Sequence, residues 1–160
     1  MSAIDHYMND IILRGGAEAQ EDGSAATEAH HLLLAIAANE GTAAHRVLTA
    51  ADLGRQAIRA ALEREFEHSL NAVGVSVASY DLPESSRAAG QPPRLGASAY
   101  LAFERGIAAA AGKKDLRPAH LLLGVLDTQI GTVPRALALA GVDRVDLMAR
   151  VRRTLAHESW

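Results

Sequence analysis

The chain has 160 residues, a formal net charge of −3 at neutral pH and no cysteine. The length suits one domain, and the lack of cysteine excludes disulfides and thiolate metal sites. Hydrophobic residues make up 49% of the chain but aromatic residues only 4%, which favours closely packed helices over a sheet. The acidic balance argues against nucleic acid as a partner, and no apolar run approaches the ~20 residues of a membrane span. Since the N-terminus shows no signal-peptide pattern, we expect a soluble, cytoplasmic protein.

The first half of the chain carries four helical patterns. We expect helices over residues 4–21, 31–38, 43–50 and 55–68. Gly15 and Gly16 weaken the first, by about 1 kcal/mol each relative to alanine. Thr27 and Thr42 are the expected N-caps of the second and third, because a threonine hydroxyl can accept a first-turn N–H. The second helix is apolar nearly all round and should be central. The fourth has three large apolar residues on one face, namely Ile58, Leu62 and Phe66.

Residues 69–95 interrupt the helical pattern. This stretch contains three prolines and several serines, which predicts a linker. Val73, Val75 and Val77 alternate as in an extended strand. Because one strand without a partner makes no sheet, we assign the stretch to coil.

The second half of the chain repeats the first. The run His31-Leu-Leu-Leu returns as His120-Leu-Leu-Leu, 89 residues later, and the offset then holds for more than thirty residues. Upstream, the same offset pairs Gly23 with Gly112. We therefore expect four further helices, over residues 96–111, 117–126, 133–140 and 144–156. The predicted fold is all-α, a single domain over residues 1–160. It has eight helices in two tandem four-helix repeats, residues 4–68 and 96–157, related by a pseudo-two-fold axis.

Nothing in the sequence indicates catalysis. Glu-x-x-His spacings occur at Glu28/His31 and Glu65/His68, but a di-iron site needs further carboxylates on long facing helices. His30 and His31 are adjacent, so on a helix they should point about 100° apart and not share one ion. No Gly-x-Ser-x-Gly or phosphate-binding loop is present. We predict no enzyme activity, no metal and no cofactor, and we expect His31 and its repeat partner to satisfy local hydrogen bonds at helix starts.

The two repeated stretches, HLLLAIAANEGTAAHRVLTAADL and HLLLGVLDTQIGTVPRALALAGVD, resemble the N-terminal repeat domain of the Clp AAA+ ATPases. The resemblance covers nearly the whole chain except the linker. It implies an eight-helix fold and a role in receiving substrates or adaptors for proteolysis. The ATPase phosphate loop is absent from this sequence, so we expect a binding module without a motor of its own.

In that family, an acidic residue beside each repeated histidine and a threonine early in each first helix bind phosphoarginine. By the resemblance these groove positions correspond here to His30 and Ala119, and to Asp5 and Arg94. A guanidinium finds no carboxylate at the first two, and Asp5 would repel a phosphate. We therefore expect phosphoarginine binding to be lost or weak.

Two binding functions remain open at this point, beside a purely structural role without a ligand. The first is binding of a protein or peptide, such as a Clp ATPase or protease component or its substrate, in a groove lined by the first helices of both repeats. The second is sequestration of a Clp-directed peptide antibiotic or another small ligand, a resistance-type role. Protein partners recovered from a lysate would favour the first, and tight binding of such a peptide without protein partners would favour the second.

Overall fold

The computed structural model describes residues 1–74 and 93–157. Within these residues the chain forms eight α-helices and one pair of two-residue strands, so the predicted all-α fold is confirmed. In chain order the elements are α1 (Ala3–Glu21), β1 (Ala26–Thr27), α2 (Ala29–Ala38), α3 (Ala43–Ala50), α4 (Arg55–Ala72), β2 (Arg94–Leu95), α5 (Ala97–Ala109), α6 (Pro118–Leu126), α7 (Thr132–Leu139) and α8 (Arg144–His157).

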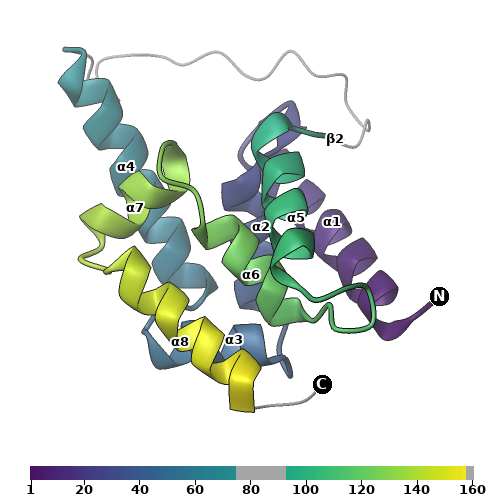
Figure 1. The fold of residues 1–160 in the computed structure, drawn as a ribbon. Helices are drawn as coiled ribbons and strands as arrows, with labels where there is room; N and C mark the ends of the chain where they lie inside the picture. Colours follow the sequence, from purple (N-terminus) through teal and green to yellow (C-terminus); the bar gives the residue numbers. More distant parts are fainter. Residues whose placement is uncertain (75–92, 158–160) are drawn as a thin grey trace.

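Helices α2 and α6, which carry the repeated His-Leu-Leu-Leu runs, lie in the middle of the molecule with the other helices around them (Figure 1). Every residue of α6 is buried, and in α2 all but His30 and Ala38 are buried. The buried apolar residues of both halves form one hydrophobic cluster. An all-round apolar helix is stable only where neighbours cover every face, which explains the central place of these two. None of the helices in the described ranges is long and apolar enough to cross a membrane.

The 89-residue offset is visible in the helix bounds. Helices α3 and α7 differ by 89 residues at both ends, and α4 and α8 begin 89 residues apart. The first helices follow another register. Gly15 packs against His31 and Leu32, and Gly106 packs against His120 and Leu121. These two glycines take the same place in their repeats but are 91 residues apart, so the pairing of Gly23 with Gly112 does not extend to α1 and α5.

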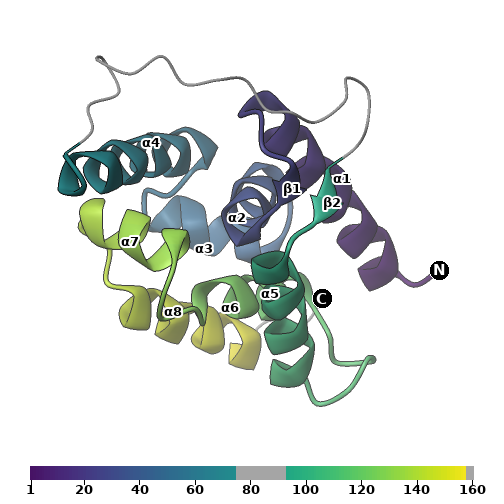
Figure 2. The ribbon, with the colours of Figure 1, turned by 90° about the horizontal axis from the view of Figure 1, so that it is seen from above.

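The junction between the repeats contains a short ladder that the sequence did not predict. Strands β1 and β2 pair in parallel, with Thr27 opposite Leu95 (Figure 2). Two residues that we assigned to coil, Arg94 and Leu95, are thus extended and paired. The Gly96 N–H donates to the Thr27 carbonyl oxygen at 2.8 Å. The Glu28 carboxylate then accepts the Ser98 N–H at 3.3 Å and the Ser98 hydroxyl, so one repeat caps the first helix of the other.

Two N-cap predictions have different outcomes. The Thr42 hydroxyl accepts the His45 N–H at 3.0 Å, which confirms Thr42 as the N-cap of α3. Thr27 as the N-cap of α2 is wrong, because the N-cap is Glu28 and Thr27 lies buried in β1. Gly15 and Gly16 do not break α1, which runs through them. Gly15 is useful there, because an added Cβ would meet Thr27 at 3.1 Å and Leu32 at 3.3 Å.

Helix α4 departs from its prediction in length and in the exposure of one residue. It continues to Ala72, four residues past the expected end, and Val73 and Gly74 form a turn; Val75 and Val77 lie outside the described residues. Phe66 is 47% exposed, so its place on the buried face is wrong. Glu65 is buried instead, and it accepts a hydrogen bond from Arg135 of α7 at 2.9 Å and one from Ser69 at 2.7 Å. Ile58 is buried and Leu62 packs against the core as predicted, so the departure is confined to Phe66 and the buried carboxylate beside it.

Candidate functional site

The four predicted groove positions fall into two pairs. Arg94 lies in β2, whose partner strand directly precedes the α2 segment that carries His30. Asp5 contacts Lys113, in the segment that leads to Ala119 on α6, at 3.2 Å. Arg94 thus lies in a strand before α5 and not early in that helix, and in the 91-residue register of the first helices the residue that matches Asp5 is Gly96. Arg94 is exposed, whereas Ala119 is buried and presents no functional group.

Asp5 is engaged in structure. Its carboxylate accepts the backbone N–H of Ser2 at 3.0 Å and the Ser2 hydroxyl at 2.6 Å, which closes a capping box at the start of α1. These hydrogen bonds, with the Lys113 ammonium, hold the pKa of Asp5 well below its usual range. The carboxylate is thus ionised and already bonded, which suits a helix cap better than a ligand contact.

His31 has both ring nitrogens occupied. Nδ1 accepts the Glu28 N–H at 2.9 Å, and Nε2 lies 2.7 Å from an Asp22 carboxylate oxygen. These partners assign the ring proton to Nε2, which donates to Asp22. In the second repeat His120 Nδ1 accepts the Arg117 N–H at 3.0 Å, and Nε2 lies 3.6 Å from Asp115. The prediction that both histidines satisfy local hydrogen bonds at helix starts is confirmed.

His30 and His31 lie closer together than the 100° argument implied. Their ring centroids are 4.0 Å apart, and with Asp22 they offer three metal-ligand atoms within 4.8 Å of one another. A metal at His31 Nε2 would need the lone pair there and would move the ring proton to Nδ1, facing the Glu28 N–H. The geometry therefore favours a helix cap over a metal centre.

Acid should destabilise the protein through His30. Burial and the neighbouring His31 lower the pKa of His30 from 6.5 to about 4, against the smaller opposite effects of Asp22, Glu28 and Glu65. Below pH 6.5 the unfolded chain binds a proton at His30 that the folded chain does not bind. The free energy of unfolding therefore falls as the pH drops from 6.5 toward 4. The loss from this residue should reach at most about 3 kcal/mol. Urea unfolding of the intact chain at several pH values measures it.

A His30→Gln variant should show a shallower dependence of stability on pH in this range. It keeps part of the slope, because burial also lowers the pKa of His120. His6→Gln, at an exposed position of α1, provides the matched control for replacing a histidine by glutamine. An unchanged slope in His30→Gln would contradict the assignment.

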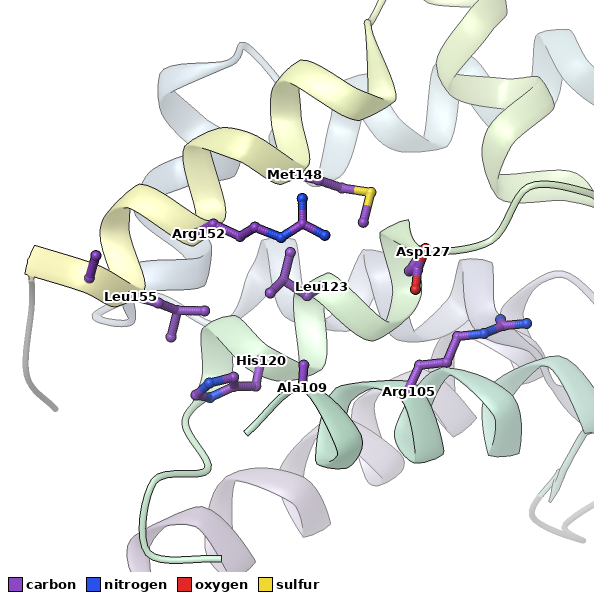
Figure 3. A pocket seen from close by; sticks show the side chains of 9 residues that line it. Arg105, Ala109, His120, Leu123, Asp127, Met148, Arg152 and Leu155 are labelled. Atoms are coloured by element: carbon purple, nitrogen blue, oxygen red, sulfur yellow. The ribbon is translucent and has the colours of Figure 1, made fainter. Parts of the chain in front are cut away.

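A crevice of about 510 Å³ lies between α5, α6 and α8 (Figure 3). Its lining combines apolar and charged side chains: Arg105, Ala109, His120, Leu123, Asp127, Met148, Arg152, Leu155 and Ala156. Figure 3 shows Arg152 extending from α8 beside Met148, and Arg105 extending from α5 at the end where Asp127 lies. Arg105 also donates to the Thr128 hydroxyl at 3.3 Å. None of the four predicted groove residues lines this crevice.

Sequence reasoning missed the crevice residues for a definite reason. Arg152 belongs to a cluster of arginines near the end of α8 that reads as a solvated helix end, and its side chain is indeed exposed. Arg152 borders a crevice because Ala109, on the different helix α5, has a small side chain. The repeat could have pointed to Ala109, because this residue corresponds to Glu18 once the first helices are aligned with an offset of 91 residues.

Comparison with known proteins supports the fold. No protein-family model matches the sequence, and no curated protein matches it. Among solved structures the chain is similar to the crystal structure of the N-terminal domain of the caseinolytic protease associated chaperone ClpD from Arabidopsis thaliana. The TM-score is 0.63, with 16% sequence identity over 92% of this chain and 90% of that chain. The chain therefore has the all-α fold of a Clp chaperone N-terminal domain.

Proposed function

We propose that this chain is a non-catalytic module that binds proteins or peptides, related to substrate or adaptor recognition in Clp-dependent proteolysis, with both repeats acting as one domain. The observation that carries the proposal is the likeness to the ClpD N-terminal domain over nine-tenths of both chains. Fold alone is a weak guide to function, so the chemistry of this chain's own surface sets the details.

Recognition of phosphoarginine should be weak. The position where a carboxylate would hold the guanidinium is Ala119 in one repeat, and Ala119 is buried. In the other repeat it is His30, whose lowered pKa keeps it neutral near pH 7. The Asp5 carboxylate adds a negative charge where a phosphate would lie. These substitutions support a ligand other than phosphoarginine.

The test is affinity capture on the immobilised intact chain from a lysate of the native host, followed by mass spectrometry. Recovery of a Clp ATPase, its peptidase or a defined set of their substrates is the expected result. A second column, which carries the thermally unfolded chain, controls for retention by exposed apolar surface. Arginine-phosphorylated and unphosphorylated casein, applied in parallel, should be retained equally poorly.

An empty capture would overturn the protein-binding proposal. Tight binding of a Clp-directed cyclic peptide in the same preparation, measured by calorimetry, would then support the sequestering role. Preferential retention of phosphorylated casein would contradict the expected loss of phosphoarginine binding.

A further inference from the structure

The first repeat holds a buried carboxylate between its first and fourth helices. Glu18 of α1 is 7% exposed and accepts hydrogen bonds from Arg55 of α4 at 2.6 Å and 3.0 Å. Arg59, one turn along α4, donates to Oε2 of the same carboxylate, an oxygen that Arg55 also contacts. Two guanidinium groups therefore neutralise one buried carboxylate in this place.

The second repeat has lost that carboxylate. In the 91-residue register of the first helices, Glu18 corresponds to Ala109, three residues after Gly106 as Glu18 is three after Gly15. In the 89-residue register of the fourth helices, Arg59 corresponds to Met148, and Arg55 to Arg144. The Arg144 guanidinium donates instead to the Leu126 carbonyl oxygen at 2.8 Å and contacts the Met148 sulfur at 3.4 Å.

The place left by the carboxylate is the crevice of Figure 3, which Ala109 and Met148 both line. One crevice position also carries the opposite charge from its equivalent in the first repeat, since Arg152 corresponds to Glu63 in the 89-residue register. The crevice thus offers the guanidinium groups of Arg105 and Arg152 against the single carboxylate of Asp127. The remaining lining is apolar or, at His120, held neutral near pH 7 by a burial-lowered pKa.

We propose that the crevice between α5, α6 and α8 binds a peptide segment of a partner protein through an acidic side chain flanked by aliphatic residues. The inference rests on the proposed peptide-binding function and names the chemistry of the bound segment. The acidic group replaces in trans the carboxylate that Glu18 supplies within the first repeat, and Arg152 is its partner. The aliphatic neighbours pack on Leu123, Met148 and Leu155, and Met148 adapts its shape to them.

The test uses three peptides, Gly-Ser-Leu-Leu-Glu-Leu-Leu-Ser-Gly and its counterparts with Gln or Lys at the centre, each carrying an uncharged fluorophore. Fluorescence anisotropy with the intact chain gives their affinities. We expect the Glu peptide to bind about tenfold or more tightly than the other two, the difference that one charge-assisted contact supplies. Raised salt should reduce this preference, because the contact lies at an exposed arginine.

Two variants locate the contact. Arg152→Gln removes the charge of an exposed side chain, and Ala109→Glu places a carboxylate inside the crevice as in the first repeat. Each should weaken binding of the Glu peptide about tenfold. Arg64→Gln, an exposed arginine of α4 located 89 residues before Arg153, is the matched control and should leave the affinity unchanged.

Equal affinity for the Glu and Gln peptides, or binding unaffected by both crevice variants, would overturn the inference. If none of the peptides binds while lysate proteins are captured equally by the intact chain and by Ala109→Glu, the inference falls and the proposed function stands. If no peptide and no lysate protein binds, both fall.

Discussion

Replacing Gly124 by alanine should lower the free energy of unfolding by about 3 kcal/mol or more. Gly124 is where α6 crosses α5. An added Cβ would lie 2.6 Å from the Gly106 nitrogen and well inside van der Waals contact of the Ala102 carbonyl oxygen. Both obstacles are backbone atoms, so relief requires the helices to separate. Thermal unfolding followed by circular dichroism should show Tm lower by about 6–12 °C, or no cooperative transition.

The control is Gly54→Ala. Gly54 is the N-cap of α4, and a Cβ there meets nothing within 4 Å, so its Tm should hardly change. The repeat equivalent of Gly124 is Ala35, a fully buried alanine. A Tm for Gly124→Ala within about 2 °C of the unaltered chain would show that α5 and α6 do not pack this closely.

Replacing Glu18 by glutamine should lower the free energy of unfolding by about 2 kcal/mol. The amide leaves Arg55 and Arg59 without a buried negative charge, although these side chains are 32% and 24% exposed and regain some solvation. Breaking a fully buried ion pair costs about 3–5 kcal/mol, and the partial exposure of both arginines reduces that figure here. Urea unfolding at neutral pH gives the difference directly.

Glu21→Gln is the matched control for Glu18. Glu21 contacts the same Arg55 at 3.3 Å, but its side chain is 60% exposed. Exposed ion pairs contribute little, so this variant should lose less than about 0.5 kcal/mol. Equal losses of unfolding free energy in the two variants would mean that burial does not make the ion pairs of Glu18 stronger than those of Glu21.

The helix bounds were predictable where the repeat and the apolar period agree. Helix α3 was placed at its observed ends, and α8 at its observed start, because two copies of one pattern support each other. The prediction failed where a long-range contact replaces a local rule. Thr27 has the side chain of an N-cap, but pairing with Leu95 places it in a strand, and Glu28 takes over the cap. Likewise the partner Arg135, seventy residues away from Glu65, buries that carboxylate and leaves Phe66 in solvent.

The candidate site was predictable only in part. The predicted groove positions Asp5, His30, Arg94 and Ala119 came from the resemblance, and Arg94 lies in β2 rather than early in a first helix. The capping role of His31 followed from its position at a helix start, because that contact is local. The crevice depends on Ala109 of α5 meeting Met148 and Arg152 of α8, and the sequence does not show that these two helices approach each other.

The sequence by itself was sufficient to predict the all-α class, the duplication and the central place of α2 and α6. These features follow from composition and from the spacing of apolar residues, which can be read along each helix without knowing its neighbours. The two-residue shift between α1 and α5, the burial of Glu65 in place of Phe66 and the crevice beside α8 required the folded chain. Each depends on which side chains meet across helices, such as Gly106 against Leu121 or Glu18 against Arg55. These contacts depend on how closely two helices pack, and a single sequence does not contain the distances between helices.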